Sequence, residues 1–379
     1  MYIPTFQGLT ATDFVRPMPA RNCESRYPFD SQPLTFYRAR NAIYYLFRAL
    51  KESNERLNVL MPDYNSGNEV LALEAAGATV SYYPVGVDGQ VDATEVERLC
   101  HAGRPDVLYV IHYLGWPQPI QQLADLSRRR GIWLVEDCAL ALLSDAGTKP
   151  LGSFGHWSIF CLYKTLPLPN GACLVENGEH LSALDHIDLR HAGFPSVIGR
   201  TAELMVRNIR SRSDSLGAAM ESMKRAAGRA AGAMDVPRAK VGDIGFNIDD
   251  VNLAMSEISA RLLRRLDFED IRGRRIANYR QLAQQLDGFI TPLHSELPEG
   301  VCPLLFPILV EDKRAVAELL RSYSVDVLEF WNHGAGADEG THARFLRAHV
   351  LGLPIHQDLT SRHIDYIAAQ TARMNLRMS

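Results

Sequence analysis

The stretch "DVLYVIHYLGWPQPIQQLADLSRRRGIWLVED", residues 106–137, contains the unit that decides the fold. Two short apolar runs, 106–112 and 132–136, have the length and composition of buried strands. The segment between them, 119–131, begins with proline and ends with basic residues and a glycine, as helices commonly do. This order predicts two parallel strands that are connected by a covering helix.

The same alternation continues on both sides of this unit. Two amphipathic segments, 38–53 and 68–78, are predicted to form helices. Four more strands are predicted at 58–62, 79–84, 158–163 and 172–176. The predicted fold class is therefore α/β, with a three-layer architecture and a mainly parallel sheet. In such sheets ligands bind at the carboxyl ends of the strands.

The chain has 379 residues, which is too long for one ordinary hydrophobic core. We therefore expect a large domain at 1–245 and a smaller C-terminal α+β domain at 246–379. Within the large domain, 178–240 is rich in Ala, Arg and Ser and is predicted to be a helical, basic insertion. It is expected to be a solvated surface helix or a mobile excursion, with a contact to a membrane or a partner as the alternative. Elements of the small domain are predicted as a long helix from 254, helices at 274–286, 313–323 and 361–374, and strands at 303–310 and 325–331.

Composition excludes several classes of function. The net charge of −4 gives no general attraction to nucleic acid or to anionic membranes. The sequence has no apolar stretch of about 18 residues, and its N-terminus does not have the pattern of a signal peptide. The six cysteines are scattered without a CxxC pair, so we expect neither a zinc site nor a disulfide framework, and we expect a cytoplasmic protein.

One lysine stands in an otherwise apolar run, "SIFCLYKTLPLPNG" at 158–171. The nearest charged residues along the chain are Lys149 and Glu176. A buried ammonium without a partner is costly, and burial lowers its pKa instead. Lys164 therefore either reaches water or is needed as a neutral amine, which can form a Schiff base.

Three further features fit a ligand beside this lysine. Asp137 ends a predicted strand, where a carboxylate can hold a cationic ring nitrogen, although a solvated strand end is the simpler interpretation. The residues from Arg38 to Asn41 begin a predicted helix, whose free N–H groups can bind a phosphate. Cys161 lies three residues before the lysine, where it is either a weak phosphate ligand or a small buried side chain. Pyridoxal 5′-phosphate has the aldehyde, the basic ring nitrogen and the phosphate that these groups would bind.

Six segments in register carry a family resemblance. They are "RARNAIYYLFRAL" (38–50), "VLMPDYNSGNEVLALEAAGATVSYYPV" (59–85), "VIHYLGWPQPIQQLADLSRRRGIWLVEDCA" (110–139), "GSFGHWSIFCLYKTLPLPNGA" (152–172), "IGFN" with "MSEISARLL" (244–263) and "LGLPIHQDLTSRHIDYI" (351–367). Together they resemble the DegT/DnrJ/EryC1/StrS aminotransferase family of fold type I pyridoxal-phosphate enzymes, most of which act on nucleotide-linked keto-sugars. The resemblance implies the aspartate aminotransferase-like fold for the large domain.

The resemblance also implies roles for single residues. Lys164 would form the Schiff base with the cofactor and later move a proton. Asp137 would pair with the pyridinium nitrogen, which keeps the ring electron-poor. Ala139 would lie beneath the ring. Arg40 and Asn41 would offer backbone N–H groups to the phosphate.

Four more residues are implied at or near the cofactor. Asn247 would reach the phosphate from the partner subunit, because the family's sites lie at a dimer interface. Tyr64 would stack on the ring, and His112 would line the site, although a packed and hydrogen-bonded histidine is the alternative. Cys161 stands where the family usually has a phosphate-binding serine.

The implied function is that of a homodimeric aminotransferase with pyridoxal 5′-phosphate and without a metal. Glutamate or another amino acid would donate nitrogen, and a keto-sugar nucleotide or related carbonyl compound would accept it in a ping-pong cycle. The chain departs from the family pattern at Leu140, at Cys161 and at Ile248-Asp249, which replaces Tyr-Arg. These changes leave open a pyridoxal-phosphate enzyme of another type (lyase, decarboxylase or condensing) or a non-catalytic relative.

Overall fold

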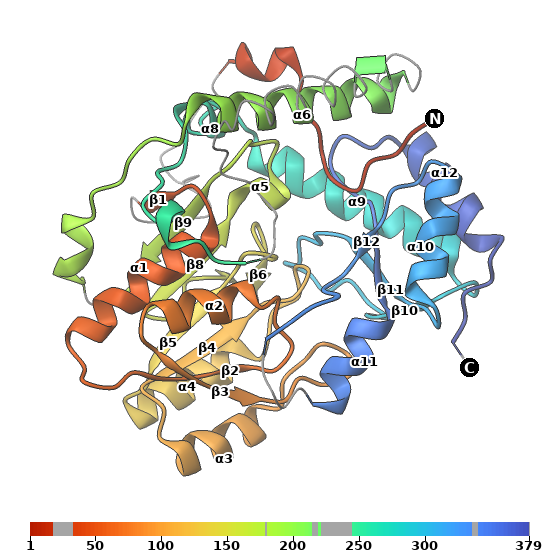
Figure 1. The fold of residues 1–379 in the computed structure, drawn as a ribbon. Helices are drawn as coiled ribbons and strands as arrows, with labels where there is room; N and C mark the ends of the chain where they lie inside the picture. The colour runs from red at the N-terminus through yellow and green to blue at the C-terminus, as the bar shows by residue number, and fades with distance from the viewer. Residues whose placement is uncertain (18–32, 179, 214–218, 221–244, 336–339, 379) are drawn as a thin grey trace.

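The computed structural model describes the whole chain except residues 18–32, 179, 214–218, 221–244, 336–339 and 379. Its centre is a seven-stranded sheet with the order β1-β9-β8-β5-β4-β2-β3 (Figure 1). The pairs β2–β3, β2–β4, β4–β5 and β5–β8 are parallel, whereas β9 is antiparallel to both β8 and β1. The predicted α/β class with a mainly parallel sheet is confirmed.

The six strands that the sequence predicts in this sheet are all present. They are β2 (Asn58–Pro62), β3 (Thr79–Tyr83), β4 (Val107–Ile111), β5 (Trp133–Asp137), β8 (Trp157–Cys161) and β9 (Ala172–Glu176). Every residue of β4 and β8 is buried, as expected for strands that helices cover on both faces. The edge strand β1 (Leu34–Phe36) was not predicted, because three residues are too few for a periodic pattern.

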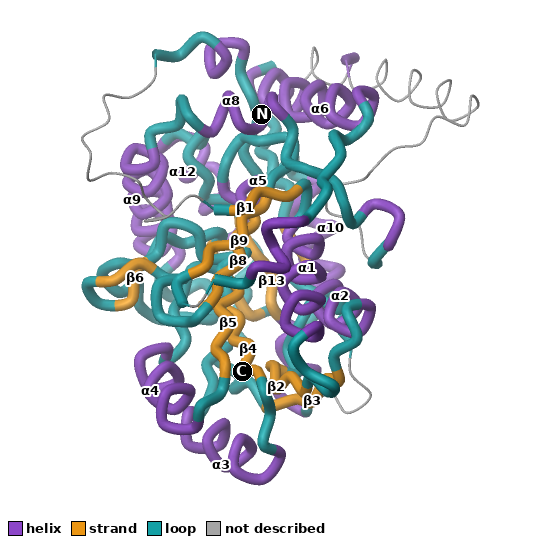
Figure 2. The backbone as a smooth tube through the Cα atoms, turned by 90° about the vertical axis from the view of Figure 1, so that its left-hand side faces the viewer, coloured by secondary structure: helices purple, strands orange, loops and turns teal. Residues whose placement is uncertain are grey.

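Helices cover both faces of the sheet. In Figure 2, α1 (Ala39–Glu52) and α2 (Asn68–Ala75) lie on one side of the strands, and α3 (Ala93–Gly103) and α4 (Ile120–Arg130) lie on the other. The predicted helix at 119–131 is α4, and Gly131 ends it with a positive φ of 63°. The three-layer architecture is therefore present. A small hairpin, β6 (Asp145–Ala146) with β7 (Lys149–Pro150), follows β5.

The C-terminal part forms a second, four-stranded antiparallel sheet with the order β10-β11-β13-β12. Its strands are β10 (Thr291–Pro292), β11 (Phe306–Leu309), β12 (Leu328–Glu329) and β13 (Val350–Leu353). Its helices are α9 (Phe268–Leu286), α10 (Lys313–Ser322), α11 (Thr341–His349) and α12 (Ser361–Ala372). The sequence did not predict β10, β13 or α11.

The prediction of one long helix from residue 254 is wrong. The chain forms a short helix, α8 (Glu257–Leu263), and then α9 from Phe268. The Asp267 side chain accepts a hydrogen bond from the backbone N–H of Asp270, which caps α9 and starts a new helix axis. The apolar stripe through Leu262 and Leu266 is still buried, because both residues enter the same core.

The predicted insertion at 178–240 is described only in its first half. It contains the 3-10 turn η2 (Ser182–His186) and a long helix, α6 (Phe194–Arg212). This helix is packed against the N-terminal segment, because the Leu9 N–H donates to the Leu204 carbonyl at 3.0 Å. Its face around Val197 and Leu204 is buried. Most of the remainder of the insertion lies outside the described residues.

The N-terminal residues join the C-terminal part of the chain, since Ile3 bridges to Val325. They precede a short 3-10 turn, η1 (Ala11–Phe14). The division into domains at 245 and 246 stays a prediction. Among the described residues, no helix has both the length and the apolar character that crossing a membrane requires. The five described cysteines are buried free thiols, and Cys23 lies outside the described residues.

Candidate active site

The sheet topology brings Asp137 and Lys164 to the same edge. Asp137 is the last residue of β5, and it pairs with Ile159 of the parallel neighbour β8. β8 ends at Cys161, and the chain then forms a single helical turn, α5 (Leu162–Thr165). Lys164 therefore lies in a turn and not at the end of the predicted strand 158–163. Both side chains are at the carboxyl edge, where parallel sheets bind ligands.

Both residues line one cavity of about 470 Å³. Five of the predicted site residues contribute to its wall, namely Arg40, Asp137, Ala139, Cys161 and Lys164. The wall also includes residues from α6 and from the segment around β12. The structure therefore gathers residues from distant parts of the sequence around the amine of Lys164.

The Asp137 carboxylate is fixed at both oxygens. Oδ1 accepts a hydrogen bond from the Ala139 backbone N–H at 2.9 Å, and Oδ2 accepts one from the Tyr109 hydroxyl at 2.6 Å. Burial, with a smaller contribution from the negative charge of Glu69, raises the pKa of Asp137 to about 6. A cation near this carboxylate would oppose that rise, so the residue is suited to a positively charged ring nitrogen.

The backbone of the lysine turn is held by buried side chains from other parts of the chain. Gln7 Nε2 donates to the Leu166 carbonyl at 2.8 Å. The Thr165 carbonyl accepts from Arg275 Nη2 at 3.1 Å and from Gln357 Nε2 at 3.2 Å. A one-turn helix leaves its carbonyls without intrahelical partners, and these three side chains provide donors instead.

The start of α1 forms another wall of the cavity. The N-cap residue Arg38 makes no side-chain capping bond, and the Arg38 and Arg40 side chains both line the cavity. Arg38 Nη2 lies 3.7 Å from an Asp250 carboxylate oxygen. Asn41 does not line the cavity: its N–H donates to the Arg38 carbonyl at 3.1 Å and its side chain donates to the Asp250 carbonyl at 2.9 Å.

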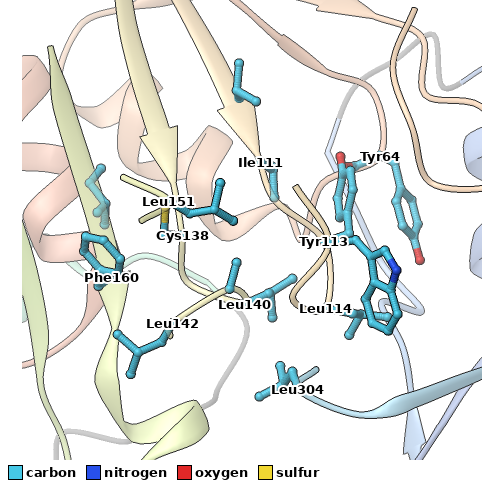
Figure 3. Packing of buried hydrophobic residues seen from close by; sticks show 14 of the residues in the cluster. Tyr64, Ile111, Tyr113, Leu114, Cys138, Leu140, Leu142, Leu151, Phe160 and Leu304 are labelled. Carbon is cyan, nitrogen blue, oxygen red and sulfur yellow. The ribbon is translucent and has the colours of Figure 1, made fainter. Parts of the chain in front are cut away.

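Tyr64 is not among the residues that line the cavity. Its ring is buried against Tyr113, with centroids 5.4 Å apart, and against Trp331 at 5.1 Å. Figure 3 shows Tyr64 beside Tyr113 within the hydrophobic cluster. Phe330 and Trp331 contribute aromatic rings to the cavity wall instead, and they stack on each other at 4.7 Å.

His112 is packed away from the cavity and is fully buried. Its Nδ1 accepts the Gln118 N–H at 3.0 Å, and its Nε2 lies 3.2 Å from Glu136 Oε2. The structure therefore matches the alternative of a packed, hydrogen-bonded histidine.

Possible ligand atoms of His112, Glu136 and Cys138 lie within 4.8 Å of one another. Glu136 is already an acceptor for three backbone N–H groups, those of Gly152, Phe154 and Gly155.

The remaining predicted residues differ in exposure. Ala139 and Cys161 are buried in the cavity wall, and burial raises the pKa of the Cys161 thiol. Asn247 is exposed and does not line the cavity. Its side chain accepts a hydrogen bond from the Asp249 N–H and caps a short turn, η3 (Ile248–Asp250). Its predicted role concerns a partner subunit and stays a prediction.

The residues around the cavity fit pyridoxal 5′-phosphate. An amine at Lys164 and a fixed carboxylate at Asp137 provide the two chemical partners that the aldehyde and the ring nitrogen need. Ala139 leaves room beside the carboxylate because its side chain is small. Arg38 and Arg40 supply positive charge at a helix N-terminus, which suits a phosphate.

Sequence reasoning missed several residues of this site. Tyr109 lies on β4 opposite Val135 of β5, and this register places it two residues from the partner of Asp137. The sequence predicted that these two strands are parallel. It did not predict their register, so Tyr109 was not recognised as a neighbour of Asp137. Glu69, Arg200 and Arg207 also line the cavity. Nothing in their local sequence indicated this, because they come from two helices, α2 and α6, that are far apart in the sequence.

A three-layer α/β fold with an amine and a buried carboxylate at one cavity defines the class of fold type I pyridoxal-phosphate enzymes. The family model for the DegT/DnrJ/EryC1/StrS aminotransferase family matches residues 33–372. The chain belongs to this family, as the resemblance implied.

Named relatives match shorter parts of the chain. GDP-perosamine synthase of Escherichia coli O157:H7 is 28% identical over 130 residues, which is 32% of this chain and 34% of the relative. The enzyme of the same name from Vibrio cholerae is 29% identical over 124 residues, 32% of this chain and 34% of the relative. The chain thus aligns with about a third of the length of these curated relatives.

Solved structures share the fold over almost the whole chain. PseC of Helicobacter pylori, an aminotransferase involved in the biosynthesis of pseudoaminic acid, has a TM-score of 0.69 at 16% identity and covers 99% of both chains. A putative sugar aminotransferase of Streptococcus pneumoniae, in its PMP form, has a TM-score of 0.68 at 15% identity and covers 98% of this chain and 99% of its own. These likenesses confirm the fold.

Proposed function

We propose that the protein is a pyridoxal-phosphate-dependent aminotransferase that moves an amino group from an amino acid to a carbonyl group of a nucleotide-linked sugar. The observation that carries the proposal is the shared cavity of Lys164 and Asp137 in a chain of this family. The relatives include GDP-perosamine synthase and a UDP-4-amino-4,6-dideoxy-N-acetyl-beta-L-altrosamine transaminase of Campylobacter jejuni, which supports a sugar as the acceptor. Glutamate is the donor that we expect.

Each residue has a separate task in this proposal. The cofactor, when bound, supplies an aldehyde that can carry an amino group and a ring that can accept electrons. Lys164 Nζ would hold the cofactor covalently, and as a free amine it would move the proton from the substrate carbon to the former aldehyde carbon of the cofactor. The Asp137 carboxylate holds the positive charge of the ring nitrogen, and Tyr109 keeps that carboxylate in place.

The position of Lys164 also decides how far its amine can move. The backbone of its turn is fixed by Gln7, Arg275 and Gln357, so only the side chain is free to move between positions. A proton shuttle needs this combination of a fixed base and a movable amine.

A single cavity contains the amine, so we propose that donor and acceptor bind there in turn, as a ping-pong cycle requires. We further propose a cytoplasmic homodimer in which Asn247 of one subunit reaches the cofactor phosphate of the other. Asn247 is exposed and does not line the cavity of its own subunit, and both facts support this arrangement.

One observation favours a second candidate, a pyridoxal-phosphate enzyme of another reaction type. Leu140 lines the cavity beside Ala139, where the resemblance leads us to expect a polar glutamine or histidine. An apolar side chain cannot hydrogen-bond the ring hydroxyl, and this changes the electronic properties of the cofactor. Lyase, decarboxylase or condensing chemistry would then act on the bound amino acid.

The test is a half-reaction with the purified protein and pyridoxal phosphate. Glutamate should convert the visible absorption of the lysine-bound cofactor into that of pyridoxamine phosphate, with release of 2-oxoglutarate. The Lys164→Ala variant should lack the visible band and the borohydride-reducible bond, whereas Lys149→Ala, at an exposed lysine, should keep both. A retained reducible bond in Lys164→Ala would show that another lysine is used, and loss of carbon dioxide without pyridoxamine phosphate would favour the second candidate.

A further inference from the structure

Helix α6 brings two arginines to the cavity from a segment that the family resemblance does not explain. Arg200 and Arg207 both line the cavity with Lys164. They are seven residues apart, about two helical turns, and therefore lie on one face of α6. The neighbouring face, with Val197 and Leu204, is buried, which fixes the rotation of the helix.

The two guanidinium groups share one carboxylate oxygen. Arg200 Nη1 and Arg207 Nη2 both donate to Glu203 Oε1, the latter at 3.2 Å. One carboxylate cannot balance two guanidinium charges. Arg200 Nε is also buried and has no hydrogen-bond partner among the described residues. A buried N–H without an acceptor is destabilising, and a bound acceptor would remove that cost.

The other carboxylates of the cavity are already engaged. Glu69 accepts hydrogen bonds from Ser66, Asp137 accepts from Tyr109 and Ala139, and Glu329 accepts from Arg321 at 2.7 Å. The described wall contains five cationic side chains and only these three carboxylates. The wall itself therefore carries more cationic than anionic side chains, and Glu203 and Asp250 pair with its arginines from just outside it.

This excess is divided between two places. Arg38 and Arg40 belong to α1, where Arg38 is near Asp250 and Arg40 donates to the Gly245 carbonyl. They lie at the helix N-terminus that suits the cofactor phosphate. Arg200 and Arg207 belong to α6, which is separate from α1, so they are placed to bind a different anion in competition with Glu203.

We propose that Arg200 and Arg207 form a binding subsite for an oxyanion of the substrate. The anion is a carboxylate of the amino donor or a phosphate of the nucleotide-linked acceptor. Guanidinium groups bind both through paired hydrogen bonds. The inference rests on the proposed function and extends it by naming the residues that recognise substrate charge.

The experiment measures binding by calorimetry to the protein loaded with pyridoxal phosphate. The probes are glutarate, a dicarboxylate that cannot react, and uridine diphosphate. Arg200→Gln and Arg207→Gln should each weaken the binding of one probe about tenfold. Arg200→Lys and Arg207→Lys, which keep the charge, should weaken it less. The probe that is affected identifies the source of the oxyanion. Arg210→Gln is the matched control, because Arg210 is on the same helix but stacks on Tyr2 outside the cavity.

A second variant tests the proposal in the opposite direction. Glu203→Gln removes the carboxylate that competes with the ligand, so it should tighten the binding of the same probe several-fold. Damage to the fold would not produce tighter binding. The thermal midpoint and far-UV circular dichroism of each variant show whether α6 is intact.

Several outcomes would overturn the proposal. Unchanged binding of both probes in Arg200→Gln and Arg207→Gln would do so. Weaker binding of pyridoxal phosphate with unchanged probe binding would assign the two arginines to the cofactor instead. If the chain does not bind pyridoxal phosphate at all, the proposed function fails, and the same titrations on the cofactor-free protein still decide whether the oxyanion subsite exists.

Discussion

Asp137 is the residue whose chemistry depends most on its surroundings. It is buried, close to the charge of Glu69, and hydrogen-bonded by Tyr109 and Ala139. The two hydrogen bonds favour the ionised carboxylate, but burial has the larger effect, and the pKa of Asp137 is raised to about 6. Even with the positive charge of Lys164 nearby, ionisation of this group therefore destabilises the fold.

This predicts a pH dependence for the cofactor-free protein. Because the pKa of Asp137 rises from 3.8 in the unfolded chain to about 6 in the folded one, the folded state binds more protons between these values. Ionisation of Asp137 should lower the free energy of unfolding by roughly 3 kcal/mol as the pH increases from about 4 to 6. Above about pH 6 this group should cause no further decrease. Asp137→Asn should remove this loss, as measured by urea unfolding at a series of pH values.

The control for this prediction is Asp125→Asn, at a carboxylate that is exposed and pairs with Arg128 on α4. Its difference from the unchanged protein should be small at every pH. Bound pyridoxal phosphate should reduce the effect at Asp137, because a positive ring nitrogen compensates for burial. A difference between Asp137→Asn and the unchanged protein that does not vary with pH would contradict the assignment.

At the scale of elements, α5 is the shortest of the described α-helices, and its stability depends most on side chains from other parts of the chain. It is one turn long, and its N-cap residue Cys161 makes no side-chain capping bond. Donors from Gln7, Arg275 and Gln357 satisfy the carbonyls at its C-terminal end. Gln7 Oε1 in turn accepts from Arg275 Nη2 at 3.2 Å, so the three donors are connected. The lysine turn is stable because of this network and not because of its own length.

Gln7→Ala should therefore be strongly destabilising for a single polar side chain. It leaves one buried Arg275 N–H without its acceptor, removes one of the two donors to the Leu166 carbonyl, which keeps the Leu168 N–H, and leaves a small cavity. We expect a loss of roughly 2–4 kcal/mol in the free energy of unfolding, measured with urea. The control is Gln281→Ala, which removes an exposed glutamine whose side chain donates hydrogen bonds to Ser361 and Asp365. This change should cost less than about 0.5 kcal/mol. Equal losses in both variants would contradict the role of the network.

At the scale of the whole molecule, one residue of the cavity wall, Leu304, is fixed where the loop after β4 meets the segment before β11. The Leu304 N–H donates to the Leu114 carbonyl at 2.8 Å, and Leu304 lines the cavity. Gly115 has a φ of +113°, and a Cβ placed on it would lie 2.4 Å from the Cys302 carbonyl oxygen. Only glycine permits this close approach of the two backbones.

Gly115→Ala tests this junction. The positive φ and the contact with Cys302 should together lower the free energy of unfolding by roughly 3 kcal/mol or more. Gly103→Ala is the matched control, because Gly103 is helical and a Cβ there meets nothing within 4 Å. That change should be neutral or stabilise by up to about 1 kcal/mol. If Gly115→Ala is as stable as Gly103→Ala, the two backbones are not in close contact.

The sequence alone determined the strands of the central sheet and the connection by α4, because buried parallel strands are apolar runs with clear ends. It also predicted that Lys164, a lone lysine in an apolar run, and the strand-end carboxylate Asp137 belong to one site, and both residues line one cavity. It failed at the break between α8 and α9, where Asp267 starts a new helix within a continuous apolar stripe.

Only the tertiary structure decided which side chains face the cavity. Tyr64 and His112 were predicted at the site but are packed outside the cavity wall, whereas Arg200 and Arg207 reach it from a helix that looked like a solvated excursion. Strand and helix patterns arise from local spacing, which the sequence states directly. The walls of a cavity arise from contacts between elements far apart in the chain, and their geometry is set by strand register and helix packing, which local spacing does not specify.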